Sequence, residues 1–115
     1  MEIFLSLERH PEVFSWDTLE FRAWPDGYYY RIAINLSDGS ILHAREFFDS
    51  RERHYSYHLQ NAEGAMLCRW DDAPHHKTIA SFPHHRHEGE TIHESAPMSL
   101  SQVLDFIAER FKKNP

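Results

Sequence analysis

The sequence predicts an α+β fold in which an antiparallel β-meander of five to six strands is covered on one face by a C-terminal helix. Turn sequences at residues 25–27, 37–40 and 61–64 separate segments rich in aromatic and β-branched residues. These segments alternate apolar and polar residues, as strands with one buried face do. Near the C-terminus the apolar residues instead recur at helical spacing. A chain of 115 residues suits one hydrophobic core, so we predict a single domain over residues 1–115.

Five strands are predicted in order along the chain, at residues 17–24, 28–36, 40–48, 53–60 and 65–71. Short connections make consecutive strands antiparallel neighbours. The apolar residues at positions 3–7 are a weaker candidate for a further edge strand. The apolar face of the sheet is predicted to carry Leu19, Phe21, Ala23, Tyr28, Tyr30, Ile32, Ile34, Leu36, Leu42, Ala44, Phe48, Tyr55, Tyr57, Leu59, Met66, Cys68 and Trp70.

The covering helix is predicted at residues 99–113. Ser99 and Gln102 fit a capping box, and Met98 with Val103 fits a hydrophobic staple. Its apolar stripe is predicted to hold Leu100, Val103, Leu104, Ile107, Ala108 and Phe111.

A long histidine-rich loop is predicted at residues 72–97, between the last strand and the helix. A loop of this length inside a compact domain is usually functional or disordered, and the apolar residues Ile79 and Phe82 favour a functional one. We expect the loop to fold back near the polar face of the sheet.

Composition limits the classes of function. The net charge of −6, with histidines neutral, argues against non-specific binding to nucleic acid. Six of the ten histidines lie in residues 75–93, where a positive patch can form near the ordinary histidine pKa of about 6.5. Cys68 is the single cysteine, which excludes a disulfide framework. We find no apolar run of the roughly 18 residues that a membrane span needs and no signal-peptide pattern, so we expect a cytoplasmic protein without membrane contact.

The histidines raise the question of a metal site. Imidazole and carboxylate groups suit Zn²⁺ or Ni²⁺, and a catalytic zinc ion needs three protein ligands. The spacing matches no zinc motif, so the favoured expectation is no cofactor, and a Zn or Ni site is the alternative. The candidate metal ligands are His85, His87, His75 and Asp71.

The same residues suit acid–base chemistry. Two imidazoles of near-neutral pKa can act as base and acid in one reaction, and a cation can stabilise a phosphate between them. Metal-independent RNA cleavage needs these groups, and Arg86 is the predicted phosphate ligand. A solvated loop over a solvated sheet face is the alternative. The candidate catalytic residues are His75, His76, His84, His85, Arg86, His87, His58 and Arg69.

Two sequence stretches also carry a family resemblance. HYSYHLQNAEGAMLCRWDDAPHH (residues 54–76) followed by SFPHHRH (residues 81–87) resembles the TumE-type toxin family of bacterial type II toxin–antitoxin modules. Asp72 stands where that family often has Asn, and Arg86 where it often has Lys. The resemblance implies a small toxin whose partner is a helix-turn-helix antitoxin, but it implies no reaction.

The leading prediction is therefore a TumE-like toxin that acts as a metal-independent ribonuclease on RNA. The competing prediction is a non-enzymatic binding module. In it, the loop holds a transition metal or the polar sheet face docks a partner protein. A homodimer through an edge strand is a further hypothesis.

Overall fold

The computed structural model describes residues 2–72 and 84–113, and it confirms an α+β fold with an antiparallel sheet and a C-terminal helix. Within these residues the elements follow one another as α1 (Glu2–Arg9), β1 (Val13–Trp24), β2 (Gly27–Leu36), β3 (Ile41–Phe48), β4 (Arg53–Gln60), β5 (Met66–Asp71), β6 (His85–Glu88), β7 (Thr91–Glu94) and α2 (Leu100–Lys113).

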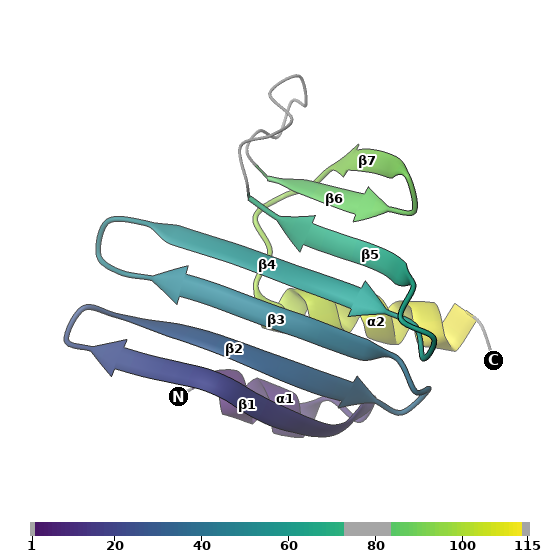
Figure 1. The fold of residues 1–115 in the computed structure, drawn as a ribbon, viewed down its shortest axis with the longest axis horizontal. Coiled ribbons are helices and arrows are strands. Elements are labelled where there is room, and N and C mark those ends of the chain that lie inside the picture. Colours follow the sequence, from purple (N-terminus) through teal and green to yellow (C-terminus); the bar gives the residue numbers. More distant parts are fainter. Residues whose placement is uncertain (1, 73–83, 114–115) are drawn as a thin grey trace.

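The strands form one sheet in the order β1-β2-β3-β4-β5-β6-β7, and each pairs antiparallel with the next. Both helices lie behind this sheet in Figure 1, so among the described residues no helix covers its other face, which we call the open face. The sheet has seven strands, and the prediction of five to six was wrong because β6 and β7 arise inside the segment predicted as a loop.

The β6–β7 hairpin corrects the prediction of a histidine-rich loop at 72–97. Its turn contains Gly89, whose φ of 60° is readily adopted by glycine. The hairpin extends the edge of the sheet, because β6 pairs with β5, and it does not fold back over the polar face. Residues 73–83 of the predicted loop lie outside the described residues.

The N-terminal segment is helix α1, so the expected edge strand at residues 3–7 was wrong. Ile3, Phe4 and Leu7 are spaced three and four residues apart, which places them on one helical face. Leu7 is buried in the core, and Ile3 and Phe4 pack against that core.

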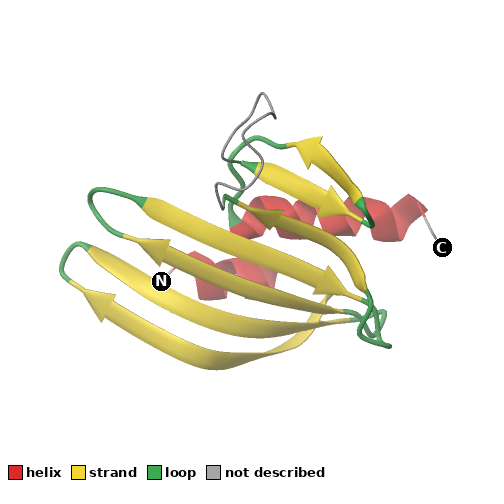
Figure 2. Ribbon diagram, turned by 45° about the horizontal axis from the view of Figure 1, so that its top comes forward, coloured by secondary structure: helices red, strands yellow, loops and turns green. Residues whose placement is uncertain are grey.

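The core lies between the sheet and the helices, which Figure 2 shows on one side of the strands. The predicted capping box is present: Ser99 N–H donates to Gln102 Oε1 over 2.9 Å, and Gln102 N–H donates to Ser99 Oγ over 3.2 Å. The side chain of Phe111 lies outside the described side chains. The buried apolar side chains are Leu7, Tyr30, Ile32, Ile34, Leu36, Leu42, Ala44, Tyr55, Tyr57, Leu59, Cys68, Trp70, Leu100, Val103, Leu104 and Ile107.

Strand β1 departs from the predicted alternation. Its register with β2 shifts between Thr18 and Glu20, and Leu19 is the extra residue. Leu19 is 54% exposed and contributes to a hollow on the open face. The prediction that Leu19 shares the apolar face with Phe21 was wrong, because a β-bulge reverses the alternation at that point.

Candidate functional site

The open face of the sheet gathers most of the predicted site residues, because strand pairing brings distant segments together. Directly opposite residues in an antiparallel pair have their side chains on the same face, about 5 Å apart at Cβ. The register of the strands therefore decides which side chains meet.

One line of residues crosses four strands on this face. Arg69 of β5 lies opposite His58 of β4 on one side and His87 of β6 on the other. His58 in turn lies opposite His43 of β3, with ring centroids 6.3 Å apart. We call His43, His58, Arg69 and His87 the His–Arg row.

Asp71 joins the His–Arg row to the neighbouring residues of β6. Its Oδ2 lies 3.0 Å from Arg69 Nε, and its Oδ1 lies 2.8 Å from Nε2 of His85, the residue opposite it. Asp71 is 4% exposed and His85 only 2%. His85 and His87 meet edge to face, with ring centroids 4.9 Å apart.

Asp71, His85 and His87 form a cluster of side chains that could bind a metal ion, and we call them the Asp–His trio. Each offers one ligand atom, and these atoms lie within 4.8 Å of one another. The fourth predicted ligand, His75, lies outside the described residues.

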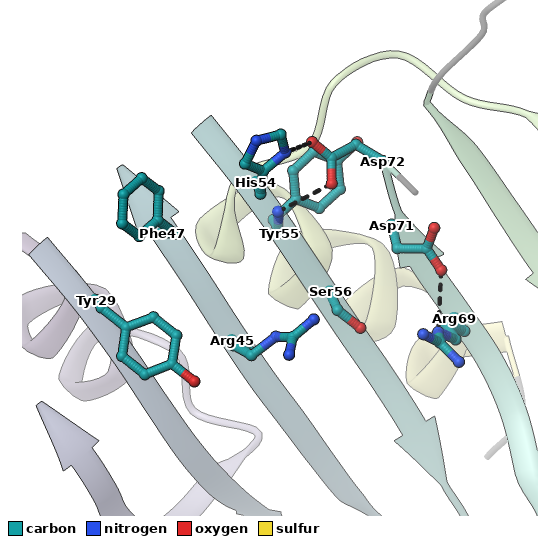
Figure 3. Close-up of a pocket in the computed structure, with 9 residues that line it drawn as sticks. All are labelled: Tyr29, Arg45, Phe47, His54, Tyr55, Ser56, Arg69, Asp71 and Asp72. Atoms are coloured by element: carbon teal, nitrogen blue, oxygen red, sulfur yellow. Dashed lines mark hydrogen bonds and ion pairs between the residues drawn. The ribbon is translucent and has the colours of Figure 1, made fainter. Parts of the chain in front are cut away.

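A pocket of about 240 Å³ lies beside the His–Arg row (Figure 3). Tyr29 and Phe47 line one part of it, and carboxylates line another. Asp72 holds the latter part together, since its carboxylate lies 3.0 Å from His54 Nδ1 and accepts from Tyr55 N–H over 3.2 Å. The pocket is lined by Tyr29, Arg45, Phe47, His54, Tyr55, Ser56, Arg69, Asp71 and Asp72.

Two histidines of this face have pKa values shifted from the ordinary histidine value. Burial, followed by the nearby Arg69 and His43, lowers the pKa of His58. The hydrogen bond to Glu52, followed by that to Asp72, raises the pKa of His54. Near neutral pH, His58 is thus biased toward the neutral base and His54 toward the cation.

Arg86 is absent from this arrangement, and the prediction that it meets His85 and His87 needs correction. Along a strand, successive side chains point to opposite faces. Arg86 lies opposite Trp70 on the helix-covered face, with its guanidinium carbon 5.3 Å from the centroid of the Phe106 ring of α2.

His84 also lies away from the His–Arg row. Its Nδ1 is 2.9 Å from the hydroxyl of Tyr55, a core residue, and the two rings stack 5.8 Å apart. The predicted residues His75 and His76 lie outside the described residues.

The structure adds His43, Arg45, His54 and Asp72 to the candidate site. Sequence reasoning did not select His43, Arg45 or His54 as site residues. The available signal was alternation, which places His43 and Arg45 on the polar face of β3, and the position of His54 within the HYSYH motif.

Residues 3–111 match the family described as Toxin TumE. The chain belongs to the TumE toxin family. This membership confirms the resemblance and supports the role of toxin in a toxin–antitoxin module, which has an antitoxin as its partner. No curated protein and no solved structure matches the chain.

The described parts of the two TumE motif stretches, residues 54–72 and 84–87, lie side by side in this fold. The HYSYH segment is in β4, Arg69 and Asp71 are in β5, and His85–His87 is in β6. These three strands are neighbours, so the TumE motif residues that face the open side form one continuous surface. In the part of this TumE-family chain that the structure describes, neither α1 nor α2 has the length and apolar character of a membrane-crossing helix.

Proposed function

We propose that this TumE-family toxin is an endoribonuclease of the cytoplasm that cleaves RNA on its open sheet face without a metal ion. The observation that carries the proposal is the position of Arg69 between His58 and His87. Arg69 takes the role of phosphate ligand that the sequence suggested for Arg86.

The spacing of these three residues suits an in-line displacement at phosphorus. Neighbouring strands lie about 4.8 Å apart, so the two histidines stand about 10 Å apart across the arginine. The RNA 2′-oxygen attacks phosphorus and the bond from phosphorus to the 5′-oxygen breaks. One imidazole accepts the 2′-hydroxyl proton and the other protonates the leaving 5′-oxygen. The products are a 2′,3′-cyclic phosphate and a 5′-hydroxyl.

The surroundings assign the roles. His58 is the general base, because its lowered pKa keeps the imidazole neutral and ready to accept a proton. His87 is then the general acid. Asp71 contacts Arg69 at Nε, which leaves the two terminal guanidinium nitrogens to donate to the phosphate.

The adjacent pocket supplies binding groups for RNA. Arg45 provides a second cation, and the rings of Tyr29 and Phe47 provide surfaces on which a base can stack. Figure 3 shows these side chains on the same side of the strands as Arg69. Arg45 and Arg69 thereby place two cations beside the carboxylates of Asp71 and Asp72, within a chain of net charge −6.

An RNA cleavage assay tests the proposal. We expect single-turnover cleavage by wild type in the presence of a chelator, with 2′,3′-cyclic phosphate ends. His58→Ala and His87→Ala should each lower the rate by about 100-fold, the usual worth of a general acid or base. His93→Ala is the matched control, because His93 lies in the same hairpin but opposite Arg86 on the other face. Full activity in both His58→Ala and His87→Ala, or activity lost on chelation, would overturn the proposal.

A second candidate function is a non-enzymatic module that docks a partner protein. It is favoured by β1, a strand at the edge of the sheet with the exposed apolar residues Phe14, Leu19 and Phe21. Unpaired strand edges accept strands of other chains. We propose a helix-turn-helix antitoxin as the occupant and pairing of two β1 strands in a homodimer as the alternative.

Growth assays separate the two candidate functions. Expression without an antitoxin should arrest growth, and Arg69→Ala should relieve the arrest if cleavage is the cause. Co-expression of a helix-turn-helix antitoxin should neutralise the wild type, and loss of this neutralisation in Phe14→Asp would favour docking through β1.

A further inference from the structure

We propose that Asp71, His85 and His87 bind a divalent transition-metal ion such as Zn²⁺ or Ni²⁺. This inference goes beyond RNA cleavage and does not depend on it, because metal binding is measured directly.

The register of the sheet builds the site. Asp71 and His85 are opposite partners on β5 and β6, and His87 lies two residues farther along β6 on the same face. The three side chains therefore converge from two strands that are far apart in sequence. Backbone pairing fixes both strands, so the ligands are held by a rigid support.

The donor set selects the metal class. Two imidazoles and one carboxylate suit borderline divalent metals such as Zn²⁺, and Mg²⁺ and Ca²⁺ prefer oxygen ligands alone. Zinc–ligand bonds of about 2.0–2.1 Å in a tetrahedron place donor atoms roughly 3.4 Å apart. The donor atoms here lie within 4.8 Å, so rotations of the side chains close the site.

Burial differs among the three ligands. Asp71 and His85 are almost fully buried, and His87 is partly exposed on the open face. A tetrahedral ion takes four ligands, so the three described donors leave one position for water or for a further side chain. The metal would replace the 2.8 Å contact between His85 Nε2 and Asp71 Oδ1.

A neighbouring group already orients the carboxylate. Arg69 Nε lies 3.0 Å from Asp71 Oδ2, which leaves Oδ1 on the side of His85. Outer contacts of this kind fix ligand orientation, and their loss typically weakens metal binding by about 10–100-fold. Arg69→Met should therefore weaken Zn²⁺ binding without removing a ligand.

Calorimetric titration of untagged, metal-free protein with ZnCl₂ and NiCl₂ tests the site. We expect a saturable event that His87→Ala and Asp71→Asn each weaken by at least about tenfold. His93→Ala should bind as wild type does, because it removes an imidazole of the same hairpin from the opposite face. Circular dichroism checks that each variant is folded. His87 is the first choice because the more buried His85 supports packing.

Cobalt substitution gives an independent readout. Co²⁺ bound by the Asp–His trio should absorb in the visible, and the band should change in His87→Ala but persist in His93→Ala. Titrations of wild type and His87→Ala that coincide would overturn the site, as would wild-type protein without saturable binding. Neither result affects the cleavage assay, which is run in the presence of a chelator. The metal-site proposal and the ribonuclease proposal can therefore be contradicted separately.

Discussion

Arg86 and His87 are neighbours in the chain, yet their side chains lie on opposite faces of the sheet. Arg86 packs over the Phe106 ring beneath the strands, and His87 stands beside Arg69 on the open face. The two residues therefore cannot act on the same phosphate, and substitutions at them should have different consequences.

Replacing each arginine by methionine separates these consequences. Arg69→Met should lower RNA cleavage by about 100-fold or more, because a cation that stabilises the transition state is lost. Arg86→Met should cleave RNA within about twofold of wild type, because its aliphatic chain still covers Phe106. Single-turnover rates measure both. An equal loss of cleavage rate in the two variants would contradict the placement of Arg69 and Arg86 on opposite faces of the sheet.

The two shifted histidines should titrate on opposite sides of pH 6.5. NMR titration of the imidazoles should place the pKa of His58 below the ordinary histidine value and the pKa of His54 above it. Arg69→Met should raise the pKa of His58, because a nearby positive charge is removed. The acidic limb of the pH–rate profile for cleavage should shift to higher pH by the same amount.

These shifts also set the pH dependence of stability. His58, with its lowered pKa, contributes stability that is present above pH 6.5 and lost as pH falls through its folded pKa. His54, with its raised pKa, contributes stability that is present below pH 6.5 and lost as pH rises through its folded pKa. Urea unfolding of His58→Gln and His54→Gln across pH should show slopes altered in opposite directions. Slopes altered in the same direction would contradict the two pKa shifts.

A buried ion pair on the helix side should matter for folding. Glu46 has only 9% of its side chain exposed, and its Oε2 lies 2.5 Å from Nε of Arg53. Arg53 also donates to the Tyr57 hydroxyl and to the carbonyl of Met98, just before α2. Glu46→Ala should lower the free energy of unfolding by about 3 kcal/mol, because it leaves a partly buried cation without its carboxylate.

Glu20→Ala is the matched control for that ion pair. Glu20 contacts Arg22 and Arg31 on the exposed surface of β1 and β2, where ion pairs contribute about 0–1 kcal/mol. Chemical denaturation measures both variants. An effect of Glu20→Ala as large as that of Glu46→Ala would contradict the role of burial.

Zinc should inhibit the ribonuclease if both proposals hold. A His87 imidazole bound to Zn²⁺ cannot protonate the leaving oxygen, so cleavage should fall as Zn²⁺ saturates the site. Zinc should also stabilise the fold, by about 2.7 kcal/mol at 100 times the dissociation constant. The Zn²⁺ concentration that halves cleavage should equal the dissociation constant from calorimetry, and the thermal unfolding temperature should keep rising with the logarithm of Zn²⁺ above that concentration. Cleavage that rises with Zn²⁺ would contradict the role of His87 as the acid.

Turn sequences and alternation made β2 to β5 predictable from the sequence, although β3 breaks the alternation by burying Glu46. Tyr55, Tyr57 and Leu59 were placed on the buried face, and the structure buries all three. The β6–β7 hairpin was missed because His85–Glu88 alternates no apolar residues, and only pairing with β5 defines it as a strand. The bulge at Leu19 likewise has no signal in residue type.

The candidate site was predicted in only part of its membership, and its arrangement was not predicted. Asp71, His85 and His87 were chosen by ligand type, and the register brings them together. Arg86 was included because a loop imposes no alternation of faces, whereas a strand does. Strand β5, with which β6 pairs, is separated from it in the sequence by residues 73–83. Local sequence patterns do not predict strand register over such a separation.

The pairing of β6 with β5 has two effects. It places His85 and His87 on the open face, and it covers the backbone edge of β5, which would otherwise be available to strands of other molecules. Damage to the hairpin would therefore produce self-association together with inactivity. Loss of activity in a variant of residues 85–88 therefore indicates a chemical role only if the variant keeps the oligomeric state of the wild type. Sedimentation velocity measures that state.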